Sequence, residues 1–82
     1  METSDDLQRS VLAIVADVAE VPVETIAPDA LLADLDIDSL RALRIVAEVE
    51  RRWNIVIGEA EIGAIRSMRD ILVLVERKSP RG

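Results

Sequence analysis

Apolar residues recur at three- and four-residue intervals along this chain, and that spacing constrains the fold more than any other feature. In residues 4–20, one side carries Leu7, Val11, Ile14, Val15, Val18 and Ala19. Such intervals place side chains on one face of an α-helix, whereas a half-buried strand requires strict alternation. Many of these residues are β-branched, but their helical spacing argues against strands. The sequence therefore predicts an all-α fold.

Local start and stop signals divide the chain into four predicted helices, at about residues 4–20, 39–53, 59–64 and 67–77. Asp38 is a good N-cap for the second helix, and Ser67 with Asp70 three residues later forms a capping box for the last. Pro22 is expected to end the first helix. We predict a four-helix bundle with three longer helices, one short third helix and a long first loop over residues 21–38, which includes a helical turn near residues 29–34. Residues 1–82 form one domain, with an ordered core at about 4–77 and a flexible tail at 78–82.

Composition excludes several function classes. The 82 residues suffice for one small domain, with Trp53 as the single aromatic residue. No cysteine is present for a disulfide and no histidine for a zinc or haem site, so we expect no metal. Apolar runs are too short to cross a membrane, and the acidic N-terminus has the wrong charge for a secretory signal, which favours the cytoplasm. A net charge of −6 disfavours nucleic-acid binding.

Charge is divided unequally along the chain. Residues 1–40 hold ten acidic residues and one arginine, a net charge of −9, whereas residues 41–82 hold six acidic and nine basic residues, a net charge of +3. The sign therefore changes immediately after Ser39. Solubility alone explains many such asymmetries, so this one only supports a functional boundary.

The predicted second helix has two apolar stripes. One, assigned to the core, consists of Ala42, Ile45, Val46, Val49 and Trp53. The other consists of Leu40, Leu43 and Ala47. A helix packed on one core cannot easily bury both, so the second stripe is expected to remain partly exposed as a contact site. The alternative is that the long loop covers it with Leu31, Leu32 or Leu35.

Ser39 begins the predicted second helix in a chain without histidine, cysteine or tyrosine. A serine does not act as a nucleophile in its own active site without a base, so Ser39 is better interpreted as a place of attachment. The structural alternative is that it merely caps the helix. The neighbouring carboxylates Asp36 and Asp38 could suggest acid–base chemistry, but at a helix start they are more often solvated.

Residues 35–40, Leu-Asp-Ile-Asp-Ser-Leu, resemble the Leu-Gly-x-Asp-Ser-Leu signature of acyl carrier proteins. The likeness extends through the approach at residues 26–35 and to Trp53, where the family has phenylalanine, and covers about residues 5–77. The resemblance implies that a phosphopantetheinyl transferase attaches 4'-phosphopantetheine from coenzyme A to Ser39. It implies that Asp38 assists by positioning magnesium, and that the arm's thiol holds an acyl thioester. Contact with partner enzymes is implied at Leu40, Arg41, Leu43, Arg44 and Ala47.

Two departures from the family pattern refine this prediction. Asp36 replaces the signature glycine, and Arg41 with Arg44 occupy positions that are acidic in fatty-acid carriers. We therefore predict a discrete, monomeric, non-catalytic carrier of a polyketide or related pathway. It would be served by an acyl-loading ligase or acyltransferase and by downstream synthase or tailoring enzymes. An aminoacyl or peptidyl carrier and an unmodified helical interaction module are the alternatives.

Overall fold

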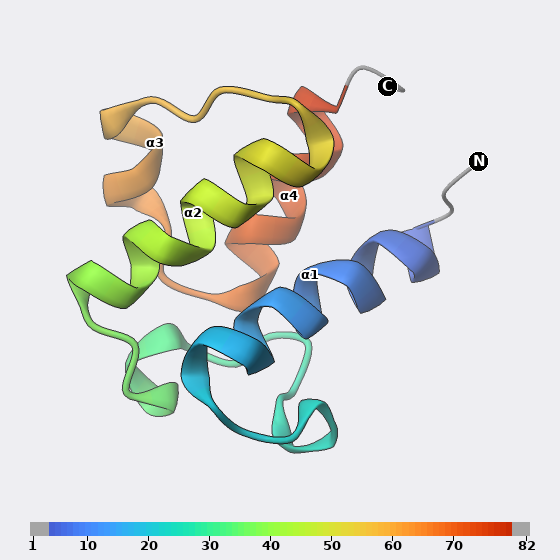
Figure 1. Cartoon of the computed structure of the whole chain (residues 1–82), viewed down its shortest axis with the longest axis vertical. Coiled ribbons are helices and arrows are strands. Elements are labelled where there is room, and N and C mark those ends of the chain that lie inside the picture. Colours follow the sequence, from blue (N-terminus) through green and yellow to red (C-terminus); the bar gives the residue numbers. More distant parts are fainter. Residues whose placement is uncertain (1–3, 80–82) are drawn as a thin grey trace.

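This computed structural model describes residues 4–79, with side chains from residue 6 onward. Within that range the chain forms four helices and two 3₁₀ turns, which are joined by loops (Figure 1). The helices are α1 (Ser4–Ala19), α2 (Ser39–Trp53), α3 (Glu59–Ala64) and α4 (Met68–Lys78). The 3₁₀ turns are η1 (Val23–Thr25) and η2 (Leu32–Leu35). Within these residues, no strand forms beyond one isolated bridge, so the predicted all-α, four-helix fold is confirmed.

The core lies between the apolar faces of α1, α2 and α4. Its most deeply buried side chains are Val11, Val15, Val18, Ile45, Val49, Met68 and Val75. The predicted core stripe of α2 is buried as expected, except that Ala42 is only half-buried. Trp53 closes the stripe at the end of α2. Burial of this one stripe fixes which face of α2 remains outside.

Left-handed residues, rather than proline, end the first two long helices. Sequence analysis extended the first helix to residue 20 and assigned its end to Pro22, but α1 stops at Ala19 because Glu20 adopts φ 61°. The Val21 N–H then donates to the Ala16 carbonyl at 3.1 Å, the bond that closes a Schellman-type end. Asn54 ends α2 similarly, at φ 55°.

The long first loop is fastened to the start of α4. Leu31 forms the isolated bridge with Ser67. The Leu32 N–H donates to the Arg66 carbonyl, and the Met68 N–H donates to the Ala30 carbonyl, both at 2.9 Å. The helical turn predicted near residues 29–34 is present as η2, shifted towards α2, whereas η1 was not predicted. These bonds hold the segment that leads into Ser39 against the bundle.

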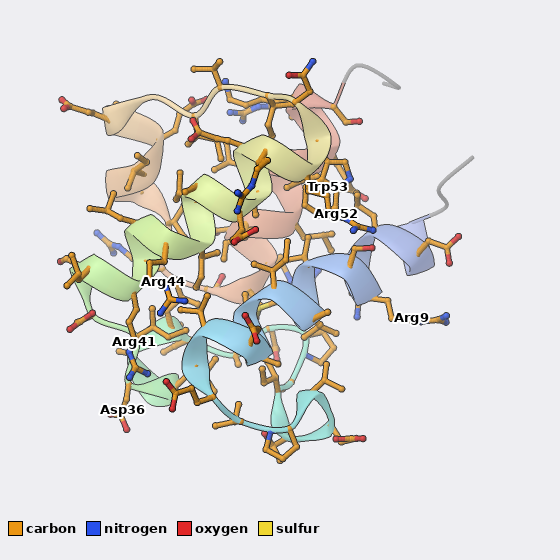
Figure 2. The ribbon with its side chains drawn as sticks, viewed as in Figure 1. Arg9, Asp36, Arg41, Arg44, Arg52 and Trp53 are labelled. Carbon is orange, nitrogen blue, oxygen red and sulfur yellow. The ribbon has the colours of Figure 1, made fainter. Side chains whose placement is uncertain are left out.

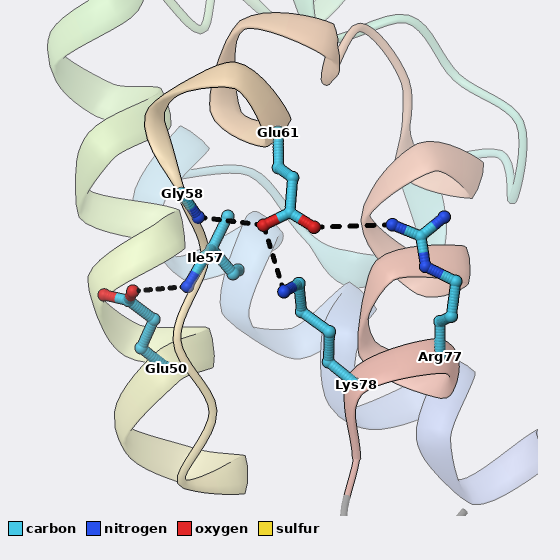
Figure 3. A network of polar contacts seen from close by, with 6 residues as sticks. All are labelled: Glu50, Ile57, Gly58, Glu61, Arg77 and Lys78. Atoms are coloured by element: carbon cyan, nitrogen blue, oxygen red, sulfur yellow. Dashed lines mark hydrogen bonds and ion pairs between the residues drawn. The ribbon is translucent and has the colours of Figure 1, made fainter.

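Glu61 connects α3 to the end of α4 (Figure 3). Its carboxylate accepts from the Gly58 N–H at 2.9 Å and lies 3.0 Å from Lys78 Nζ and 3.4 Å from Arg77 Nη2. The Gly58 N–H, followed by Lys78, lowers the pKa of Glu61 below its usual value. Lys78 was predicted to lie in the flexible tail, but it is the last residue of α4 and pairs with Glu61. Residues 80–82 of the predicted tail lie outside the described part.

The start of α4 has the predicted capping box. Ser67 Oγ accepts from the Asp70 N–H at 3.2 Å, and Asp70 Oδ2 accepts from the Ser67 N–H at 3.2 Å. Among the described residues, no helix is long and apolar enough to cross a membrane.

Candidate attachment site

Asp38, rather than Ser39, caps α2. Asp38 has extended backbone angles, and its Oδ1 accepts from the Arg41 N–H at 2.9 Å, which confirms the predicted N-cap. Ser39 is consequently the first residue of the helix. Its side chain is exposed and makes no hydrogen bond with any residue of the described part. The interpretation of Ser39 as a cap is therefore wrong, and its hydroxyl is available for chemistry.

Asp36 occupies the left-handed region, with φ 58° and ψ 33°, at the position where the signature has glycine. Its N–H donates to the Ala33 carbonyl at 3.2 Å, and the following Ile37 N–H donates to the Leu32 carbonyl at 3.1 Å. These bonds end η2 and turn the chain towards Asp38. Asp36 therefore has a backbone conformation that glycine adopts more readily than other residues do.

Opposite charges flank Ser39 in space as well as in sequence. Asp34, Asp36 and Asp38 are exposed on the loop that precedes it. Figure 2 shows Asp36, Arg41 and Arg44 on the left side of the view, with Arg9, Arg52 and Trp53 to the right. Ser39 therefore lies at a boundary between an acidic loop and a basic helix start.

The second apolar stripe of α2 is open to solvent next to this boundary. Leu40 is 72% exposed and Leu43 is 49% exposed, and Ala47 is exposed as well. The loop leucines leave the stripe exposed: Leu32 is buried in the core, Leu35 is partly buried against the core, and Leu31 is itself 50% exposed. The structure thus exposes all three residues that sequence analysis expected to be a contact site.

The bundle interior beneath this site is filled. A small void of about 10 Å³ is lined by Leu32, Ala42, Ile45, Val46, Val49, Ile57, Ile65 and Ile71. That volume is no larger than one water molecule requires. Within the described residues, no three acidic side chains gather into a metal-binding cluster. The accessible chemistry of this end of the molecule is thus the Ser39 hydroxyl and its charged surroundings.

Comparison with known proteins agrees with this geometry. Residues 9–73 match the family described as "Phosphopantetheine attachment site". The polyketide-8 synthase acyl carrier protein 2 of Streptomyces avermitilis is 36% identical over 66 residues, which cover 79% of this chain and 76% of that protein. The acyl carrier protein of Streptomyces coelicolor is 37% identical over 75 residues, which cover 84% of this chain and 79% of that protein.

Larger proteins and a solved structure also match. The 3-methylorcinaldehyde synthase of Phoma sp is 37% identical over 71 residues, which cover 87% of this chain but only 3% of the synthase. The crystal structure of an acyl carrier protein from Thermotoga maritima superposes with a TM-score of 0.79 at 23% identity, over 92% of this chain and 88% of that one. At that identity the structural likeness establishes the fold.

The fold and the family match place this chain in the class of carrier proteins. It belongs to the acyl carrier protein family, and its cofactor is covalently held 4'-phosphopantetheine.

Proposed function

We propose that this chain carries a polyketide-type acyl group as a thioester on a phosphopantetheine arm joined to Ser39. The supporting observation is the position of Ser39: it is the exposed first residue of α2, and no described residue engages its hydroxyl. The preceding Asp38 performs the capping that a serine at this place would otherwise perform.

The residues around Ser39 suit a phosphodiester at its Oγ. The first turn of α2 directs backbone N–H groups and the positive end of the helix dipole towards a bound phosphate. Asp38 has one oxygen occupied by the Arg41 N–H, which leaves Oδ2 for a magnesium ion brought by the transferase. The transferase would also supply the base that removes the Ser39 proton, because the chain has no histidine. When bound, the arm supplies the thiol that holds the cargo, in a chain that has no cysteine.

The relatives favour a polyketide acyl group over an aminoacyl group. They include a polyketide synthase acyl carrier protein and non-reducing polyketide synthases of Penicillium brasilianum. We propose a non-catalytic, monomeric, cytoplasmic domain over residues 1–82. Its partners would be a transferase, an acyl-loading enzyme and synthase or tailoring enzymes. Because the interior void holds about 10 Å³, the cargo would stay outside the bundle in this conformation.

Modification in vitro tests the proposal. The purified chain is incubated with a broad-specificity phosphopantetheinyl transferase, magnesium and either coenzyme A or acetyl-coenzyme A, and its intact mass is recorded. We expect one phosphopantetheine or acetyl-phosphopantetheine per chain, and release of the acetyl group by hydroxylamine, which cleaves thioesters. The Ser39→Ala variant is the control and is expected to keep its original mass. An unmodified wild-type chain would contradict the proposal.

A further inference from the structure

We infer that enzymes acting at Ser39 dock on the first half of α2 with a face that surrounds an apolar recess with carboxylates. The docking surface consists of Leu40, Arg41, Leu43, Arg44 and Ala47. This inference rests on the proposed function and adds the chemistry of the partner to it. Four features of the surface carry it: its unpaired arginines, their place on the helix, its exposed leucines and the charge boundary at Ser39.

The arginines of α2 fall into two groups. At the far end, Arg51 pairs with Glu48 at 2.7 Å, and Arg52 donates to Ser10 Oγ at 3.2 Å and lies 5.5 Å from the Trp53 ring centroid. Near Ser39, by contrast, neither Arg41 nor Arg44 has an ion pair or side-chain hydrogen bond with any residue that the structure describes. The two positive charges next to Ser39 are therefore available to a partner.

The position of Arg41 is unfavourable for the isolated helix. It lies in the first turn of α2, where the helix dipole favours acidic side chains and disfavours cations, and no acidic residue occupies that turn. Arg44 follows one turn later, and Glu48, the carboxylate one turn beyond it, pairs with Arg51 instead. Arg41 therefore opposes the helix dipole, and neither arginine gains an ion pair within α2, whereas a carboxylate from outside would attract both.

The leucines add an apolar contact between the charges. Leu40 and Leu43, three residues apart, lie on one face of α2, and Ala47 continues that face one turn further. Exposed apolar side chains gathered beside charged residues are typical of a protein contact site. A recess that accepts the leucines and carboxylates that meet the arginines would complement the whole surface.

The charge boundary then fixes the orientation of the partner. The loop before Ser39 presents Asp34, Asp36 and Asp38, whereas the helix after it presents Arg41 and Arg44. Of these residues, Figure 2 labels Asp36, Arg41 and Arg44. A partner with carboxylates towards α2 is repelled if it turns so that those carboxylates meet the acidic loop. The favoured orientation is therefore the one in which the partner's carboxylates face Arg41 and Arg44, away from the acidic loop, while its active site reaches Ser39.

A charge-swap experiment tests this inference. Two phosphopantetheinyl transferases of known structure serve as probes, one with an acidic and one with a basic face around its coenzyme A site. For each we measure kcat/KM for the wild-type chain, Arg44→Glu and Arg9→Glu. Arg9→Glu is the matched control because Arg9 is an exposed arginine on the opposite side of the view in Figure 2 and gives the same change in net charge. The thermal midpoint of each variant establishes that it is folded.

With the acidic-faced transferase, we expect Arg44→Glu to lower kcat/KM about tenfold at low salt, since steering by charge changes association rates on this scale. With the basic-faced transferase, it is expected to raise kcat/KM, whereas Arg9→Glu changes either value less than about twofold. Leu43→Ser, which removes the apolar contact, is expected to lower kcat/KM with both enzymes.

The inference is overturned if Arg44→Glu improves the acidic-faced reaction or changes kcat/KM no more than Arg9→Glu does. If neither transferase modifies the wild-type chain, the proposed function is itself wrong and the docking inference falls with it. Modification of the wild type thus distinguishes the two failures.

Discussion

Replacing Asp36 by glycine is expected to stabilise this protein. Asp36 has φ 58° and ψ 33°, a conformation that costs most L-residues about 1–2 kcal/mol but that glycine adopts freely. Aspartate lowers this cost where its side chain bonds locally, yet the Asp36 carboxylate makes no hydrogen bond or ion pair with the described residues. It therefore bears most of the cost.

Glycine also has an opposite effect on stability. It has more conformational freedom than aspartate in the unfolded chain, and losing this freedom on folding costs about 0.5–1 kcal/mol. The midpoints of these two ranges differ by about 0.75 kcal/mol, so we expect a net gain of about 0.5–1 kcal/mol. For a domain of this size, 1 kcal/mol moves the thermal midpoint by about 4–8 °C, so Asp36→Gly is expected to raise it by roughly 2–8 °C. Removing one carboxylate from beside Asp34 and Asp38 acts in the same direction.

The single tryptophan makes the measurement direct. Trp53 is buried, so its fluorescence reports unfolding in urea, and an unchanged slope against urea concentration shows that the free energies of unfolding can be compared. Asp36→Ala is the control, because it removes the charge but keeps the Cβ. We expect the order glycine, then aspartate, then alanine. Equal stability of the glycine and alanine variants would show that the left-handed backbone is not the cause.

Three further predictions concern the N-cap of α2, the carboxylate of Glu61 and the packing of the core. Asp38→Ala loses the bond to the α2 backbone and is expected to lower the free energy of unfolding by about 1 kcal/mol in urea titrations, whereas Asp38→Asn keeps most of it. Because the folded-state pKa of Glu61 is lowered, its contribution to stability is present at neutral pH and is lost as the pH falls below the usual value of 4.5. The stability difference between the wild type and Glu61→Gln is therefore expected to shrink as the pH is lowered through and below 4.5, and a constant difference would contradict this. Val49 is in the core, and Val49→Ala is expected to lower the free energy of unfolding by about 2 kcal/mol, measured by calorimetry. Leu40→Ala is expected to stay within about 0.5 kcal/mol of the wild type, because Leu40 is exposed. Equal losses in the two variants would mean that Leu40 is covered.

Elements bounded by local chemistry were predictable from the sequence. The start of α2 follows from Asp38, and the start of α4 follows from the Ser67–Asp70 capping box, because both signals act within one helical turn. The end of α1 was not predictable, because Glu20 carries no signal for the left-handed region that it adopts. The pairing of Lys78, the last residue of α4, with Glu61 was not predictable either, because the two residues are far apart in the sequence. Gly58 and Glu61 are three residues apart, the spacing of a capping pair, and this was the clue in the sequence to their hydrogen bond.

The candidate site likewise has features that the sequence predicts and features that it does not. The helical spacing of Leu40 and Leu43 was enough to expect their exposure, since a single core buries a single face. The backbone at Asp36 was beyond sequence reasoning, because aspartate is found in both left- and right-handed turns. Whether Arg41 and Arg44 were paired also depended on tertiary structure, because a carboxylate from any neighbouring element could have approached them.

Localising the modified hydroxyl tests the central claim most directly. Trypsin is expected to release residues 10–41 as one peptide, because Arg9 and Arg41 bound a stretch without lysine or arginine. After incubation with transferase, magnesium and coenzyme A, fragmentation of this peptide distinguishes its three hydroxyl residues, Ser10, Thr25 and Ser39. We predict that the phosphopantetheine mass is confined to fragments that contain Ser39. Its absence, or its presence on Ser10 or Thr25, would contradict the account.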